Sequence, residues 1–207
     1  MIKNIIFDIG NVITHFIEDE VLKSYSDDKN VQEFLRENVI YSPEWVQYGL
    51  IDLGYISLEN MGNAICDRTN HVHDDLVMDL SMNHARFIEV QDKVLELIEK
   101  LRKNGYKVYI LSNTNEVAMK RHDEKGLTNK VDGHVYSYEV HKLKPYIGIY
   151  KELLDKYNLN PSECIFLDDR KENIITACNL GIHGENVEAN NYNSLIDSLK
   201  KYNINID

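Results

Sequence analysis

Five short apolar segments, spaced along the chain, limit the fold more than any other feature. They are residues 5–7, 107–111, 134–136, 164–167 and 182–183, and all but the last run directly into polar or turn-forming residues. Short apolar runs bounded by turn residues are typical of buried β-strands. The sequence therefore predicts five short strands with little solvent contact.

Helical patterns separate these strands. Apolar residues recur at helical spacing in residues 90–101, 149–154 and 174–180, with Gly105 and Gly181 as stop signals and Pro145 in a first-turn position. Strands that alternate with helices indicate βαβ units and a parallel sheet. We expect an α/β fold with a Rossmann-like parallel sheet, in which ligands gather at the carboxyl ends of the strands.

One long segment interrupts this alternation. Residues 18–85 contain several helical patterns and no convincing strand. A chain of 207 residues suits one domain that carries a small insert. We expect residues 1–17 and 86–207 to form an α/β core domain, and residues 18–85 to form an all-helical cap domain inserted after the first strand.

Polar side chains stand where the predicted strands end. They are Asp8 after the first strand, Ser112 and Asn113 after the second, Asp168 and Asp169 after the fourth, and Lys144 before Pro145, at the start of a helix that leads into the fourth strand. A parallel sheet would bring all of them to one rim. Phosphoryl transfer needs this mixture of a nucleophile, carboxylates for a hard cation, and donors for phosphoryl oxygens. Each residue alone has another interpretation, since Asp at a strand end often caps a helix and Lys144 could be a solvated lysine.

In this order the motifs resemble those of the haloacid dehalogenase (HAD)-like hydrolase superfamily. The matching segments are Phe7 to Val12, Ile110 to Asn115, Lys144-Pro145 with Ile149-Tyr150, and Phe166 to Asp169 with Asn173 and Gly181. Within the superfamily the chain is most similar to the branch with bacterial α-D-glucose-1-phosphate phosphatases. The Asp-x-Gly-Asn-Val form of the first motif and the segment Gly54 to Glu59 carry that similarity.

The resemblance implies a role for each side chain in hydrolysis of a small phosphorylated metabolite. Asp8 would attack phosphorus and form an aspartyl-phosphate, which divides one difficult hydrolysis into two easier steps. Ser112 and the backbone N–H of Asn113 would hold phosphoryl oxygens. Lys144 would neutralise the charge between Asp8 and the phosphate.

The resemblance also implies Mg²⁺ as the cofactor. Its ligands would be Asp8, the backbone carbonyl of Gly10 and Asp169, with Asp168 acting through water. Carboxylates this close together repel one another unless a cation lies among them.

Gly10 departs from the family pattern. Most superfamily phosphatases carry a second Asp there as general acid and base, and its loss could remove about 10²- to 10⁴-fold of rate. A less basic leaving group would reduce the need for an acid. His15 could substitute, since imidazole titrates near neutrality, although its sequence context favours a structural position at the hinge.

Two other functions stay open. Haloacid dehalogenases also use an Asp nucleophile and lack the second Asp, but they need no metal, and the Asp168-Asp169 pair argues against them. A non-catalytic phospholigand-binding protein would keep the same pocket residues.

The cap is expected to close over the site and exclude water. Its hinges are predicted at residues 14–17 and 84–87. Four cap aromatics could stack on a sugar ring or form the core of the helical bundle: Tyr41, Trp45, Tyr48 and Tyr55.

The composition of the chain limits the classes of molecule that it can bind. A formal charge of −11 disfavours nucleic-acid binding, and the apolar stretches are too short to cross a bilayer. Cys66, Cys164 and Cys178 show no metal-ligand spacing and are expected to be buried thiols in a reducing cytoplasm. We expect a cytoplasmic monomer or weak homodimer.

Overall fold

Five parallel strands form the central sheet of the computed structural model, which describes residues 1–44 and 49–206. The sheet order is β5-β4-β1-β6-β7. The strands are β1 (Asn4–Phe7), β4 (Lys107–Ser112), β5 (Gly133–Tyr136), β6 (Cys164–Asp168) and β7 (His183–Asn186). The predicted parallel α/β fold is confirmed, and β7 lies slightly later in the chain than predicted.

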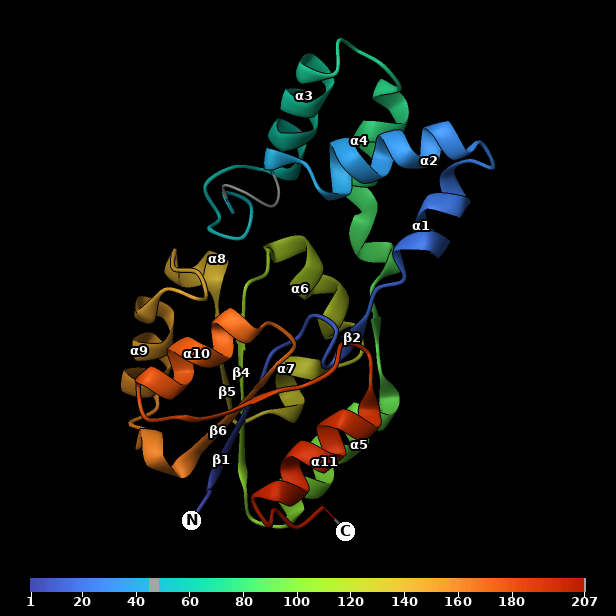
Figure 1. Cartoon of the computed structure of the whole chain (residues 1–207). Coiled ribbons are helices and arrows are strands. Elements are labelled where there is room, and N and C mark those ends of the chain that lie inside the picture. The colour runs from blue at the N-terminus through green and yellow to red at the C-terminus, as the bar shows by residue number, and fades with distance from the viewer. Residues whose placement is uncertain (45–48, 207) are drawn as a thin grey trace.

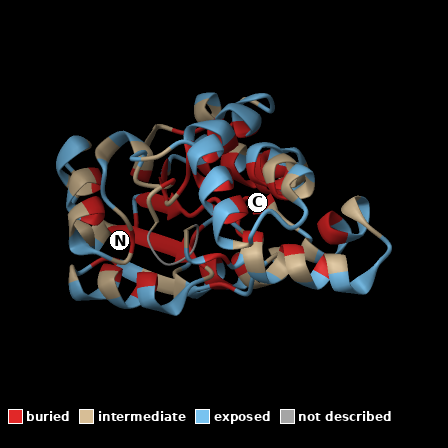
Figure 2. Ribbon diagram, turned by 90° about the horizontal axis from the view of Figure 1, so that it is seen from above, coloured by how far each residue is buried: buried red, intermediate tan, exposed pale blue. Residues whose placement is uncertain are grey.

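Helices cover both faces of the sheet (Figure 1). They are α5 (Asp92–Lys103), α6 (Glu116–Asp123), α7 (Leu127–Lys130), α8 (Ser137–Val140), α9 (Ile147–Lys156), α10 (Lys171–Asn179) and α11 (Tyr192–Lys201), and a 3₁₀ turn, η4 (Pro161–Glu163), precedes β6. Alternate residues of β1 point to opposite faces. Ile5 and Phe7 pack with α5, α7 and α11, whereas Ile6 packs with α9 and α10. Figure 2 shows the strands buried between these helices.

The described helices between Glu18 and Phe87 form a separate group above the carboxyl edge of the sheet (Figure 1). They are α1 (Glu18–Tyr25), α2 (Lys29–Leu35), η1 (Arg36–Ile40), α3 (Leu58–Arg68), α4 (Asp74–Asn83) and the start of η3 (His84–Phe87). Asp28 and Ser57 cap α2 and α3 through their side chains. Leu22, Leu35, Met61 and Ile65 belong to a hydrophobic cluster of their own. These helices therefore have a core distinct from the two clusters that flank the sheet.

The chain passes between sheet and helices through a two-stranded ribbon. The strands β2 (Thr14–His15) and β3 (Glu89–Val90) pair antiparallel. Each strand has two residues, too short for an apolar pattern, and the sequence did not predict them. The strand β2 lies within the predicted hinge segment 14–17, and β3 lies just after the predicted hinge segment 84–87.

The loop that leads into α3 rests on the core. The Leu53 carbonyl oxygen lies 2.7 Å from His141 Nδ1, and the rings of Tyr55 and His141 stack with centroids 5.4 Å apart. Gly54 has φ +71°, and a Cβ there would lie 2.9 Å from the Tyr138 carbonyl oxygen. Glycine is required at this close approach. We call residues 49–55 the docking loop.

Two expectations need correction. Cys178 is exposed, with its Sγ beside Gly184 of the edge strand β7, while Cys66 and Cys164 are buried as predicted. Tyr41 and Tyr55 are 58% and 61% exposed and so do not form the core of the helical group. Trp45 and Tyr48 lie outside the described residues.

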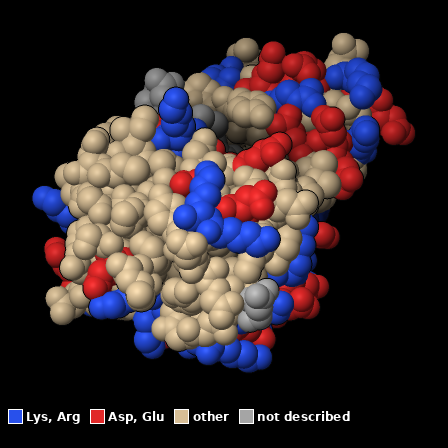
Figure 3. Space-filling model, turned by 60° about the horizontal axis from the view of Figure 1, so that its bottom comes forward, with Lys and Arg blue, Asp and Glu red and all other residues tan. Residues whose placement is uncertain are grey.

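Charged side chains are distributed unevenly over the surface. On the face shown in Figure 3, acidic groups gather over the cap, and the Lys and Arg side chains are interrupted by acidic and uncharged ones. None of the helices in residues 1–44 and 49–206 has the length and apolar character needed to cross a membrane.

Candidate active site

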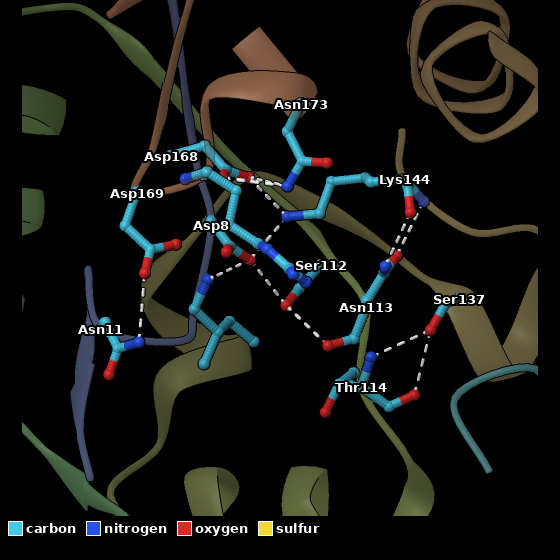
Figure 4. Close-up of polar contacts among 12 residues, drawn as sticks. Asp8, Asn11, Ser112, Asn113, Thr114, Ser137, Lys144, Asp168, Asp169 and Asn173 are labelled. Atoms are coloured by element: carbon cyan, nitrogen blue, oxygen red, sulfur yellow. Dashed lines mark hydrogen bonds and ion pairs between the residues drawn. The ribbon is translucent and has the colours of Figure 1, made fainter. Parts of the chain in front are cut away.

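Asp8 lies directly after β1, at the centre of the carboxyl edge of the sheet. Its side chain is nearly buried, and Oδ1 accepts hydrogen bonds from the Ile9 backbone N–H (2.7 Å) and from Ser112 Oγ (2.8 Å) (Figure 4). Ser112 ends β4, the strand next to β1. Two adjacent strands thus fix the orientation of one carboxylate.

Lys144 reaches this carboxylate from the segment that precedes α9. Its Nζ lies 2.8 Å from Asp8 Oδ1 and 2.7 Å from Asp168 Oδ2, and the residue is 4% exposed. Asn113 holds the Lys144 backbone from both sides. Its Nδ2 donates to the Lys144 carbonyl (2.9 Å), and its Oδ1 accepts from the Lys144 N–H (2.8 Å). Lys144 is therefore a buried cation held between two carboxylates.

Asp168, the last residue of β6, is fully buried. Asn173 Nδ2 lies 2.9 Å from each of its oxygens, and the Arg170 N–H donates to Oδ1 at 2.8 Å. With Lys144 on Oδ2, both oxygens are engaged by the protein. The main contact of the Asp168 carboxylate is therefore with Lys144, which it orients, and not with the cavity.

Asp169 is only half-buried and accepts a hydrogen bond from Asn11 Nδ2 at 3.1 Å. Oxygen atoms of Asp8, Asp168 and Asp169 lie within 4.8 Å of one another. Three carboxylates against the single ammonium of Lys144 leave two negative charges, which a divalent cation would balance. An all-oxygen donor set at this spacing fits a hard cation such as Mg²⁺.

Burial and charge shift the titration of these groups. Burial raises the pKa of Asp8 to about 6, and the Asp168 charge adds to this, while Lys144 opposes it. Burial also raises the pKa of Asp169. Burial lowers the pKa of Lys144, but Asp8 and Asp168 outweigh it, so the net shift is upward and Lys144 stays charged.

Two cavities adjoin the site. One, of about 530 Å³, is lined by Asp8, Lys144 and Asp169 from the core and by Gly49 from the docking loop. The second, of about 310 Å³, extends between core and cap, and its walls include Ser112, Ile40 and Leu80. Gly10, Asp52 and Asn113 line both cavities.

The structure brings together all but one of the catalytic, phosphate-binding and metal-ligating candidates from the sequence. Asp8, Ser112, Asn113, Lys144, Asp168 and Asp169 meet at one edge, and Gly10 lines the cavity beside them. His15 lies in the β2–β3 ribbon and lines a separate hollow with Glu20, Arg86 and Glu89.

Sequence reasoning missed two residues of the site. Asn11, which has φ 57°, turns its amide toward Asp169. Asp52 lies in the docking loop, and its place two residues before Gly54 was the available clue. Burial raises the pKa of Asp52 to about 6, although the Asn115 side chain and the Lys144 charge lower it.

Comparison with known proteins gives a consistent result. D-Ribitol-5-phosphate phosphatase from Bacteroides thetaiotaomicron is 27% identical over 197 residues, 87% of this chain and 89% of that protein. A HAD family enzyme from the same organism, solved in complex with magnesium and inorganic phosphate, has a TM-score of 0.71 at 24% identity, covering 94% of this chain and 99% of that one. L-2-Haloacid dehalogenase from Xanthobacter autotrophicus has a TM-score of 0.67 at 18% identity, covering 99% and 85%.

The two solved structures share the fold with this chain. The sequence signature of haloacid dehalogenase-like hydrolases extends over residues 2–181, which include Asp8, Ser112, Asn113, Lys144, Asp168 and Asp169. The resemblance inferred from the motifs is thereby confirmed: the chain belongs to the haloacid dehalogenase-like hydrolase family.

Proposed function

We propose that this hydrolase is a Mg²⁺-dependent phosphatase that acts on small phosphate monoesters through an aspartyl-phosphate at Asp8. The observation that carries the proposal is the contact of Asp8 with Lys144 beside a three-carboxylate cluster, at the wall of a cavity. A dehalogenase that works without metal would have no use for the two uncompensated negative charges.

Each residue has a defined task in this reaction. The Asp8 carboxylate attacks phosphorus as the bond to the leaving-group oxygen breaks, and water then hydrolyses the aspartyl-phosphate. Ser112 and the Asn113 backbone N–H donate to phosphoryl oxygens, while Lys144 neutralises charge between Asp8 and the phosphate. Mg²⁺, held by Asp8, the Gly10 carbonyl and Asp169, with Asp168 through water, would supply charge neutralisation on the phosphoryl group.

We propose sugar or polyol phosphates as the substrate class. The relative named D-ribitol-5-phosphate phosphatase supports an acyclic polyol phosphate, and the first-motif resemblance supports glucose 1-phosphate. Residues 18–85 would act as the cap that closes over the substrate, with residues 1–17 and 86–207 as the catalytic core.

Purified protein assayed with p-nitrophenyl phosphate, ribitol 5-phosphate and glucose 1-phosphate, with and without Mg²⁺, tests the proposal. We expect metal-dependent phosphate release. Asp8→Asn should lose about 10⁴-fold or more of kcat, as other enzymes do when the nucleophile is removed. The matched control is Asp155→Asn, which changes an exposed carboxylate and should keep wild-type activity.

Other outcomes would select a different function. Halide release from a 2-haloacid without metal would indicate a dehalogenase. Tight phosphate binding with no turnover of any ester would indicate a phospholigand-binding protein.

A further inference from the structure

Ester hydrolysis at this site needs a proton that the core does not supply. An alkoxide leaving group is a strong base and departs faster when an acid protonates its oxygen. Gly10, two residues after Asp8, lines both cavities and carries no side chain. A Cβ built on Gly10 would meet nothing within 4 Å, so the space beside the nucleophile is open.

Several titratable side chains line the two cavities, and most are unsuited to this task. Lys144 and Asp169 belong to the charge cluster around Asp8. Glu172 is exposed and paired with Arg170 at 3.1 Å, and Tyr146 is 72% exposed.

The two histidines of the second cavity are poor acids. Burial lowers the pKa of His122 to about 4 and also lowers the pKa of His84. Both are therefore neutral near pH 7. Neither lines the cavity that contains Asp8. Among the described residues, Asp52 is the carboxylate that lines both cavities together with Gly10.

The docking loop fixes Asp52 over the core. The contacts of Leu53 and Tyr55 with His141 hold the loop immediately after Asp52. On its other side, a Cβ on Gly49 would lie 2.6 Å from Leu143 Cδ1, so this end of the loop also packs against the segment that carries Lys144. Asp52 is thus held in a short loop with contacts on both sides, and it lines the same two cavities as Gly10.

We propose that Asp52 is the general acid and base of the reaction, brought to the site by the cap. In the first step its carboxylic acid protonates the leaving-group oxygen as the phosphorus–oxygen bond breaks and the Asp8–phosphorus bond forms. In the second step the resulting Asp52 carboxylate takes a proton from water as that water attacks phosphorus and releases Asp8. Asp52 ends protonated, and no other reactant is needed.

The environment of Asp52 suits both steps. A pKa of about 6, raised by burial, leaves part of the population protonated near neutrality and makes the carboxylate an adequate base. The Asn115 side chain and Lys144 keep the pKa from rising further.

The test compares leaving groups and rests on the phosphatase function proposed above. The ratio kcat/KM reports the steps through formation of the aspartyl-phosphate. Asp52→Asn keeps the side-chain shape and cannot donate an acidic proton. We expect kcat/KM to fall about 10²- to 10⁴-fold for ribitol 5-phosphate, whose leaving group is a basic alkoxide. For p-nitrophenyl phosphate, whose phenolate leaves without a proton, the fall should be less than about tenfold.

Two further variants sharpen the comparison. Asp75→Asn, an exposed carboxylate of α4, changes the cap charge equally and should leave both ratios unchanged. Gly10→Asp in the Asp52→Asn background places a carboxylate in the open space and should restore part of the alkyl-phosphate turnover selectively.

The outcomes separate this inference from the proposed function. Equal losses on both substrates, or none, would overturn the role of Asp52 while leaving the phosphatase intact. Wild-type protein inactive on every ester would instead remove the phosphatase function itself. Activity of Asp52→Asn on p-nitrophenyl phosphate also shows that the variant folds.

Discussion

Individual charges in this site are balanced by contacts from distant parts of the chain. Lys144 is buried between Asp8 and Asp168, and Asn113 fixes its backbone. Asp52 has no such lysine in hydrogen-bonding contact and carries its charge in a half-buried, poorly solvated place. Burying a carboxylate without a close cation favours the protonated form, so the two positions differ in how pH affects them.

Asp52 should make the protein less stable as pH rises. Its pKa is about 6 in the folded protein against 3.8 in an unfolded chain, so its contribution is complete below about pH 4 and is lost as pH rises through 6. Asp52→Asn removes that loss. Urea unfolding without metal should give equal free energies for variant and wild type near pH 4, and a variant more stable by about 1 to 3 kcal/mol near pH 7.5. A variant less stable at the higher pH would contradict the burial of this carboxylate.

The residues that could be predicted from sequence share one property. Asp8, Ser112 and Asp168 end buried strands, and the parallel sheet fixes where strand ends meet. Asp52 could not be predicted, since its place depends on a loop that contacts residues 88 positions later in the chain. Periodicity reports which face of an element is apolar and carries no information on such a contact.

Among the elements, the longer strands and helices could be predicted from their apolar patterns, whereas the pairing of two-residue strands could not. The apolar segment of β1 and the apolar face of α5 can be recognised directly in the sequence, and the structure contains both elements. The two-residue strands β2 and β3 depend on each other and on the cap crossings beside them. The docking loop contains no helix or strand, yet at Gly54 its backbone approaches Tyr138 so closely that an added Cβ would lie 2.9 Å from the Tyr138 carbonyl oxygen.

Two glycines with the same φ provide a matched test of the docking loop. Gly54 and Gly126 both have φ +71°, but a Cβ on Gly54 would lie 2.9 Å from the Tyr138 carbonyl oxygen, and one on Gly126 would meet nothing within 4 Å. Both alanine variants should lose about 1 kcal/mol of stability from the left-handed conformation. Gly54→Ala should also lower kcat/KM about 10- to 100-fold, because the loop must shift. Equal activity of the two variants would show that loop position does not matter.

For the whole molecule, the proposed metal binding would be coupled to folding through the carboxylate cluster. Its oxygens lie at the carboxyl ends of both β1 and β6, so an ion that joins them would connect neighbouring strands only in the folded chain. Ligands that bind the folded state alone raise its apparent stability.

Mg²⁺ should therefore stabilise the protein against heat. At about 100 times its Kd it should add about 2.7 kcal/mol, which corresponds to a rise in Tm of about 5 to 10 °C. Asp169→Asn should lose this rise, whereas Asp155→Asn, whose side chain is exposed, should retain it. Differential scanning fluorimetry with and without Mg²⁺ measures the effect. An equal rise in Tm for both variants would show that Mg²⁺ binds elsewhere.

The contact between Leu53 and His141 has a consequence for timing. On the proposed mechanism, the loop that seals the chamber also delivers the proton, so the two events cannot be separated. A molecule with its helical part swung away would hold the nucleophile and the lysine ready but lack the acid. Turnover of esters with strongly basic leaving groups would then begin only after the substrate has been enclosed. Bulk water would then have little access to the reacting groups.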